Sequence, residues 1–153
     1  MTAAKPVLVS ACLLGKRCRY DGRDNQDSVL QRELESRGER AVPFCPEEAG
    51  GLGTPRPAAW IEGRGAGAVV DGEDRVVTGD GVDVTAQFLA GAEGALAECR
   101  AQGIGRAYLK ERSPSCGVCN THVGGELVEG PGVTAELLAR NGVSVEGVEG
   151  RRD

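Results

Sequence analysis

Three apolar segments of the chain each lead to a cysteine near a turn. The segments are residues 6–14, 40–44 and 107–110, and their cysteines are Cys12, Cys45 and Cys116, respectively. A continuous apolar run is typical of a strand that is buried on both faces, as in a parallel sheet. Because the carboxyl ends of parallel strands line the ligand crevice of an open α/β sheet, we expect the three thiols to meet there.

Helical patterns separate these predicted strands. They lie between Asp27 and Gly38, between Asp83 or Thr85 and Gly103, and at residues 132–141, and a last strand is predicted at residues 143–148. Parallel strands need crossover connections, which helices supply. The alternation therefore predicts an α/β fold with a mainly parallel sheet flanked by helices, in Rossmann-like or flavodoxin-like layering.

The length of 153 residues is close to that of one domain. We expect a single domain over residues 1–150 and a frayed tail at residues 151–153. Residues 68–71 and 75–78 flank a turn and predict a small β-hairpin, and residues 60–61 predict a short edge strand.

The composition narrows the class of protein. Hydrophobic residues make up 40% and charged residues 27%, which is typical of a soluble globular domain. The formal net charge of -5 argues against general nucleic-acid binding, which needs clustered cations. No apolar run approaches the ~20 residues that span a bilayer, and no export signal precedes the first strand. We expect a cytoplasmic protein whose thiols are reduced or bound to metal.

Three thiolates at one sheet edge favour a soft metal ion or an iron-sulfur cluster. Each cysteine alone has an alternative role as a small buried hydrophobe. Cys99 falls on the apolar stripe of the longest predicted helix, where we expect packing rather than ligation. Cys18 lies between two arginines, whose charge activates a neighbouring thiol, and it is either a reactive thiol or a spare ligand.

Cys116 and Cys119 form a C-x-x-C pair that His122 follows closely. The pair suits either a dithiol redox couple or a zinc site completed by His122 and one distant cysteine. Residues 120–125 predict a turn and hairpin rather than the helix of a thioredoxin-like motif, so zinc is the stronger of these two alternatives. Since His122 is the sole histidine, mechanisms that need two histidines are excluded.

Polar side chains near these cysteines are candidates for acid-base work. Glu47 lies two residues beyond Cys45, so we expect its carboxylate at the crevice, with a solvated loop acid as the alternative. The loop at residues 113–117, Ser-Pro-Ser-Cys-Gly, offers hydroxyl and N–H groups to a small polar substrate, although serine also serves ordinary turns. Tyr20 and Arg56 add stacking and cationic groups that suit a flat heterocycle or an anion.

Four motifs together resemble the thiouracil desulfurase (TudS-like) family over nearly the whole chain. They are residues 10–15 (Ser-Ala-Cys-Leu-Leu-Gly), 18–22 (Cys-Arg-Tyr-Asp-Gly), 45–47 (Cys-Pro-Glu) and 109–117 (Leu-Lys-Glu-Arg-Ser-Pro-Ser-Cys-Gly). The resemblance implies a 4Fe-4S cluster with three cysteine ligands, Cys12, Cys45 and Cys116, and one open iron. It also implies a non-redox reaction in which the substrate sulfur binds at the open iron and oxygen from water replaces it, with release of sulfide.

The same resemblance assigns roles to individual residues. It implies proton transfer and water activation by Glu47, substrate or proton handling by Ser113, and supporting roles for Ser115 and Asp21. The implied substrate is a small thiolated pyrimidine, as a free base or a nucleoside, because this acidic chain has no obvious RNA-binding appendage.

Two alternatives to this reaction stay open at this point. The short segment from Cys119 to His122 departs from the family pattern, which affects substrate identity more than cluster binding, so another small thio-compound is one alternative. The other is a non-catalytic binding module stabilised by zinc at Cys116, Cys119 and His122.

Overall fold

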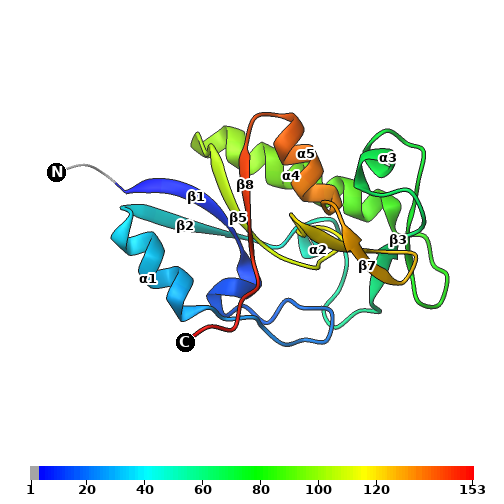
Figure 1. Ribbon diagram of the computed structural model, residues 1–153, viewed down its shortest axis with the longest axis horizontal. Coiled ribbons are helices and arrows are strands. Elements are labelled where there is room, and N and C mark those ends of the chain that lie inside the picture. Colours follow the sequence, from blue (N-terminus) through cyan, green and yellow to red (C-terminus); the bar gives the residue numbers. More distant parts are fainter. Residues whose placement is uncertain (1–3) are drawn as a thin grey trace.

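The computed structural model describes residues 4–153 and contains two four-stranded sheets (Figure 1). The first sheet is parallel throughout, in the order β2-β1-β5-β8. Its strands are β1 (Lys5–Ser10), β2 (Glu39–Phe44), β5 (Arg106–Lys110) and β8 (Ser144–Val148). This parallel sheet with its flanking helices confirms the predicted single-domain α/β class.

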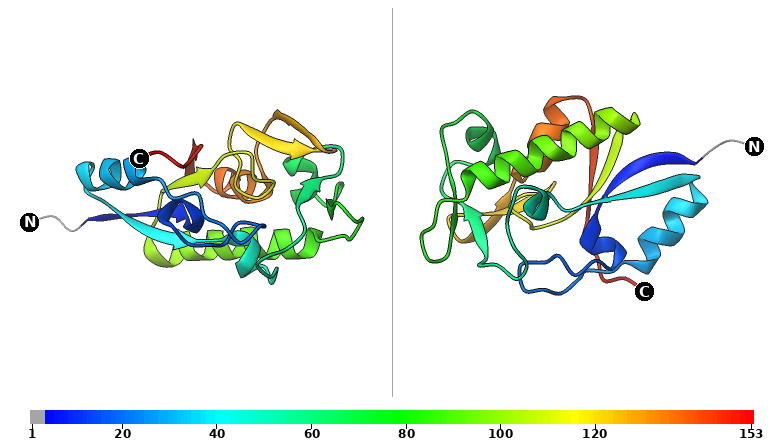
Figure 2. Two further views of the ribbon diagram at one scale, coloured as in Figure 1. Left: turned by 90° about the horizontal axis from the view of Figure 1, so that it is seen from below. Right: turned by 180° about the vertical axis from the view of Figure 1, so that it is seen from behind.

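Helices cover both faces of the first sheet. They are α1 (Ser28–Ser36) on one face and α4 (Thr85–Gln102) with α5 (Val133–Arg140) on the other (Figure 2). Side chains alternate along β1, so Val7 and Val9 lie in the cluster with Leu30 of α1, whereas Leu8 lies in the cluster with Leu96 of α4. The segment is continuously apolar because both of its faces are buried.

The second sheet is mixed, in the order β4-β3-β6-β7. Its strands are β3 (Ala59–Ile61), β4 (Val76–Thr78), β6 (Asn120–Val123) and β7 (Glu126–Glu129). Strand β3 pairs antiparallel with β4 and parallel with β6, and β6 and β7 form the hairpin that residues 120–125 predicted. Ile61 and Val76 share a buried cluster with Phe88 of α4, which joins this sheet to the rest of the domain.

The hairpin predicted at residues 68–71 and 75–78 is wrong. Residues 66–70 form the helix α3 (Ala66–Val70), and β4 pairs with β3 instead. A short apolar run does not distinguish a buried helical turn from a strand. Here Ala66 and Val69, which are one turn apart, are both buried. The strand predicted at residues 60–61 is present as β3. It lies inside the second sheet, between β4 and β6, and not at the edge as predicted.

A short helical turn follows each of the first two parallel strands. The strand predicted over residues 6–14 ends at Ser10, and η1 (Ala11–Leu14) is a 3-10 helix that ends at Gly15, whose φ of 95° suits glycine. Strand β2 leads into α2 (Pro46–Ala49), a helix with Cys45 at its N-cap and Pro46 as its first residue. Cys12 and Cys45 thus lie in turns just beyond the ends of β1 and β2.

Helix α4 begins and ends close to the predicted residues. Asp83 Oδ1 accepts a hydrogen bond from Thr85 N, and Gly103 ends the helix with a φ of 67°. Cys99 is buried along its inner side, as predicted. No helix within residues 4–153 is long and apolar enough to cross a membrane.

The tail that we expected to fray makes contacts with the start of α1. Ser28 N donates to Arg152 O, and Arg152 Nε lies 2.9 Å from Oδ2 of the fully buried Asp27. Arg151 donates from its backbone N to Asn25 O and from its Nε to Asn25 Oδ1, both at 3.2 Å. Residues 151 and 152 therefore hold the loop that precedes α1.

Candidate active site

A cavity of about 620 Å³ lies beyond the carboxyl ends of β1, β2 and β5. Cys12, Cys45 and Cys116 line this cavity together with Glu47 and Ser113, and we call it the thiol cavity. Its volume is typical of small-molecule sites, and its position is that of ligands in open parallel sheets. The chain therefore brings together three thiols, a carboxylate and a hydroxyl from three distant segments.

The loop that carries Cys116 is fixed by two polar side chains. Ser113 Oγ accepts hydrogen bonds from the backbone N–H groups of Ser115 and Cys116, at 3.1 and 3.0 Å. The buried Glu111 carboxylate accepts from three successive backbone N–H groups, starting with that of Val118 at 2.9 Å. These bonds hold the turn around Cys116 without any regular secondary structure.

Cys18 lowers the pKa values of two other thiols of the cavity, those of Cys12 and Cys45. Its hydrogen bond lowers the pKa of Cys12 to about 7, against the opposing effect of burial, and Asn25 Nδ2 donates to Cys12 Sγ at 3.4 Å. A hydrogen bond from Cys18 also lowers the pKa of Cys45. The pKa of Cys18 itself is raised by its hydrogen bonds with these two thiols and by burial. Thiolates rather than thiols bind metals, so this arrangement favours metal ligation by Cys12 and Cys45.

Cys116 is the most deeply buried of the three predicted ligands. Burial raises the pKa of its thiol, and a hydrogen bond with Ser10 acts in the opposite direction. Ser10 Oγ accepts from Lys110 N at 3.0 Å, which fixes the hydroxyl between β1 and β5. Lys110 also lines the cavity, its pKa is lowered by burial, and its charge favours the Cys12 thiolate.

Glu47 is held at the wall of the cavity by an ion pair. Arg56 Nε donates to Glu47 Oε2 at 3.0 Å, and the two side chains are 7% and 18% exposed, respectively. Arg56 Nη2 also donates to Cys18 O at 2.8 Å. The arginine therefore ties the carboxylate to the segment that carries Cys18.

Two predicted site residues lie outside the cavity lining. Ser115 is 1% exposed, and its hydroxyl is hydrogen-bonded at 2.7 Å to that of Thr134 in α5. Asp21 pairs with Arg19 at 2.9 Å, and it is Arg19 rather than Asp21 that lines the cavity. Any contribution of these two residues therefore passes through their partners.

The residues of the zinc alternative do not assemble. Within residues 4–153, one set of three donor atoms lies within 4.8 Å of one another, and it is not formed by Cys116, Cys119 and His122. Cys116 is buried whereas Cys119 is exposed, and His122 Nδ1 is 2.9 Å from Arg112 O. The turn after Cys116 leaves Cys116 in the interior and Cys119 at the surface. The C-x-x-C spacing alone did not reveal this difference.

Aromatic side chains gather at the thiol cavity although the chain has few of them. It contains one tryptophan, two tyrosines and two phenylalanines, and three of these five, Tyr20, Phe44 and Trp60, line the cavity. The other two, Phe88 and Tyr108, are buried elsewhere. The cavity wall thus combines apolar ring faces with polar groups, as sites for flat heterocycles do.

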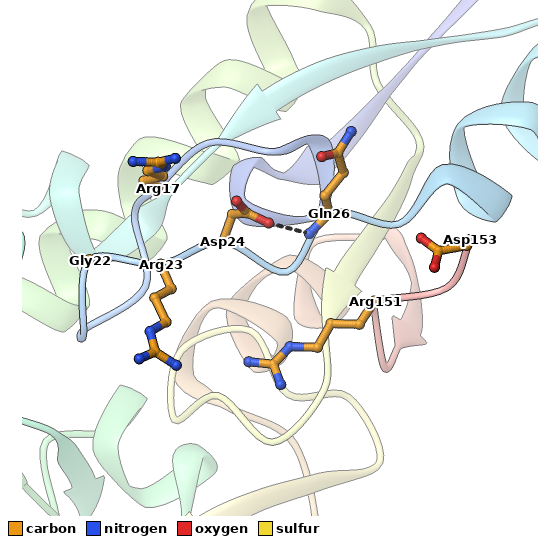
Figure 3. A pocket seen from close by; sticks show the side chains of 7 residues that line it. All are labelled: Arg17, Gly22, Arg23, Asp24, Gln26, Arg151 and Asp153. Atoms are coloured by element: carbon orange, nitrogen blue, oxygen red, sulfur yellow. Dashed lines mark hydrogen bonds between the residues drawn. The ribbon is translucent and has the colours of Figure 1, made fainter.

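A second pocket, of about 500 Å³, lies beside the loop before α1 (Figure 3). It is lined by charged side chains, among them Arg17, Arg23 and Arg151, with Asp24 and Asp153. Asp24 Oδ1 accepts a hydrogen bond from Gln26 N at 2.9 Å, which is drawn as a dashed line in Figure 3. None of the predicted site residues lines this pocket, so the thiol cavity is the candidate active site.

Sequence reasoning missed several residues of the thiol cavity. Asn25, which contacts Cys12, was not singled out. Ser10, which contacts Cys116, and Lys110 were considered only as parts of motifs. No spacing rule connects Asn25 with a thiol 13 residues away, because the contact depends on the path of an irregular loop. Cys18, left undecided by its sequence context, is placed against two predicted ligands.

The chain is similar to known proteins over most of its length. The family model described as 2-thiouracil desulfurase matches residues 7–149. The uncharacterized protein YbbK of Bacillus subtilis is 38% identical over 142 residues, which cover 91% of this chain and 93% of that protein. A solved structure described as a [4Fe-4S]-dependent thiouracil desulfidase, TudS, is 47% identical, with a TM-score of 0.79, over 94% of this chain and 90% of that one. These matches confirm the resemblance seen in the motifs, and the chain belongs to the 2-thiouracil desulfurase family.

Proposed function

We propose that this chain replaces the sulfur of a small thiolated pyrimidine by oxygen from water and releases sulfide. The observation that carries the proposal is the convergence of Cys12, Cys45 and Cys116 with Glu47 on one cavity. The reaction exchanges one carbon-sulfur double bond for a carbon-oxygen double bond, and both protons of water leave with the sulfur. No electrons are transferred, so no redox partner is needed.

The donor set of the thiol cavity fits an iron-sulfur cluster. Cys12, Cys45 and Cys116 would hold a 4Fe-4S cluster, the group on which the related TudS depends, because thiolates are the usual ligands of such clusters. When bound through three protein ligands, the cluster supplies one open, Lewis-acidic iron to the substrate sulfur. The lowered pKa values of Cys12 and Cys45 support this assignment, since ligation requires the deprotonated thiols.

We assign proton transfer to Glu47. Arg56 occupies one carboxylate oxygen, Oε2, and the other, Oε1, accepts no hydrogen bond from the residues that the structure describes. The free oxygen can therefore accept a proton from water as the oxygen attacks the carbon that bears sulfur, and can return it to the departing sulfide. The ion pair fixes the carboxylate, so little reorganisation is needed during the reaction.

Ser113 is assigned to the substrate. Its oxygen already accepts two backbone N–H groups, so its own proton remains available to donate toward a group in the cavity. Ser115 and Asp21 support the site indirectly. Ser115 does so by joining the Cys116 loop to Thr134. Asp21 does so by orienting Arg19.

The test of the proposed acid-base role is Glu47→Gln, which keeps the size of the side chain. We expect the iron content and cluster absorbance of the wild type, with sulfide release from thiouracil reduced about 10²- to 10⁴-fold under anaerobic conditions. Normal turnover by this variant would refute the assignment. Release of sulfide from other thio-compounds but not from thiouracils or thiouridines by the wild type would instead favour the alternative substrate class.

The ligand assignment has a matched control within the chain. Cys12→Ala, Cys45→Ala and Cys116→Ala should each lose stable cluster binding, measured as iron and sulfide per chain. Cys119→Ala removes an exposed thiol and should keep both at the wild-type level. Full cluster content in any of the first three variants would show that another residue is the ligand.

A further inference from the structure

Cys18 lines the thiol cavity but is not used by the cluster assignment. It is only 3% exposed, and its Sγ, the Sγ of Cys45 and a carboxylate oxygen of Glu48 all lie within 4.8 Å of one another. These three residues come from two segments, the loop after η1 and the start of α2. They form a group of metal-binding donor atoms that differs from the cluster set in two of its three members.

We propose that Cys18, Cys45 and Glu48 form a site for a single soft divalent cation such as Zn²⁺ in the cluster-free chain. A tetrahedral zinc ion with Zn–S distances of about 2.3 Å holds two sulfur ligands about 3.8 Å apart. Donor atoms within 4.8 Å of one another reach that geometry by small rotations of their side chains. The fourth position is left to water, as in zinc sites with three protein ligands.

The surroundings of the three donors offset their charge. Two thiolates and a carboxylate carry three negative charges, of which a divalent ion neutralises two. Lys16 Nζ lies 3.0 Å from Glu48 Oε1 and balances the remaining charge. Its side chain is 60% exposed, so it can shift from the oxygen that binds the ion and still stay close to the site. Thr54 Oγ1 donates to Glu48 Oε2 and orients the carboxylate, as partners of metal ligands do.

Zinc and the cluster exclude each other in this arrangement. Cys45 belongs to both sets, so one ion at the site blocks assembly of the cluster, a consequence that rests on the proposed function. The binding of zinc itself does not rest on it, because Cys18 and Glu48 are outside the cluster set. The site would therefore make the cluster-free chain sensitive to the zinc concentration during cluster assembly.

The experiment measures both metals in the same variants of the full-length chain. Zn²⁺ binding is followed in iron-free protein by competition with a chromophoric chelator, and Co²⁺ is used to detect thiolate ligation by its charge-transfer absorption. We expect one ion per chain, bound at least about tenfold more weakly by Cys18→Ala and by Glu48→Gln, because each removes a direct ligand. Cys116→Ala should bind zinc as the wild type does.

Cluster reconstitution should give the opposite ranking. Cys116→Ala should fail to hold iron, whereas Glu48→Gln should retain the wild-type iron content, because Glu48 does not line the thiol cavity. Glu48→Gln keeps the shape of the side chain, so it decides the question alone if Cys18→Ala does not fold. The proposed site would be overturned by an unchanged zinc affinity in Glu48→Gln or in a folded Cys18→Ala. It would also be overturned if Cys116→Ala lost zinc to the same extent as these variants. Absence of desulfurase activity in the cluster-loaded wild type would overturn the proposed function and leave zinc binding unaffected.

Discussion

The crossing of α2 and α4 depends on two glycines, Gly50 and Gly91. Substitution of Gly91 tests whether this contact fixes the position of α2, which carries Glu47. A Cβ added at Gly91 would lie 2.7 Å from the carbonyl carbon of Pro46 and nearer still to its oxygen, against at least 3.4 Å in ordinary contact. Gly50, just after α2, is as close to α4, since its Cβ would lie 2.9 Å from Gln87 C. The backbones of the two helices are therefore in direct contact, and Gly91→Ala must push α2 away by about 0.7 Å or more.

The expected cost of Gly91→Ala follows from this contact. Overpacking against rigid backbone costs about 3 kcal/mol, and alanine returns about 1 kcal/mol of helix propensity, which leaves about 2 kcal/mol. For a chain of this size the melting temperature should fall by about 4–8 °C. Because α2 carries Glu47 and has Cys45 as its N-cap, a shift approaching 1 Å should reduce turnover by about 10²-fold.

Gly94→Ala is the matched control, three residues along the same helix. Its Cβ would meet only the end of the Phe44 ring, at 3.3 Å, and a ring can turn aside where a backbone cannot. We expect its melting temperature to rise by about 2–4 °C, for a gain of up to about 1 kcal/mol. Differential scanning calorimetry and sulfide release give both values, and equal melting temperatures for the two variants would refute the reasoning.

Three further changes probe the cavity. Trp60→Ala should raise the KM for thiouracil about tenfold or more, because stacking on a base contributes about 1–3 kcal/mol. Trp60→Phe should largely restore the KM, and an unchanged KM in Trp60→Ala would exclude a stacking role. Cys18→Ala should raise the pKa of Cys12 above its value of about 7, seen as a shift of the thiolate absorbance titration in cluster-free protein to higher pH, and an unmoved midpoint would contradict the hydrogen bond. Glu111→Gln should lower the free energy of unfolding by about 2 kcal/mol in a denaturant titration, since it weakens charge-assisted bonds to three backbone N–H groups.

The first sheet and the position of the thiols could be predicted because local patterns carry them. Strand β1 is apolar on both faces, so its segment indicated a buried parallel strand, and the cysteine at its end had to lie at the edge of the sheet. The long helix α4 was bounded by Asp83 and Gly103, whose chemistry suits helix ends whatever the rest of the chain does. These inferences need only contacts between near neighbours in the sequence.

The pairing within the second sheet and most polar contacts of the site could not be predicted in this way. Strand β3 has three residues and pairs with β4 and β6, which are distant in sequence, so its short apolar segment indicated a strand but not its two partners. The ion pair of Glu47 with Arg56 joins α2 to an irregular segment nine residues away. Such contacts depend on how loops cross in space, which a pattern of apolar residues does not record.

The hydrogen bonds between Arg151 and Asn25 connect the end of the chain to a thiol near its beginning. Asn25 donates to Cys12 Sγ, and it is held in turn by the backbone and side chain of Arg151. While the nascent chain still lacks residue 151, the thiol near its beginning is without its final surroundings. The complete hydrogen-bond surroundings of Cys12 therefore form only once residue 151 has joined the fold.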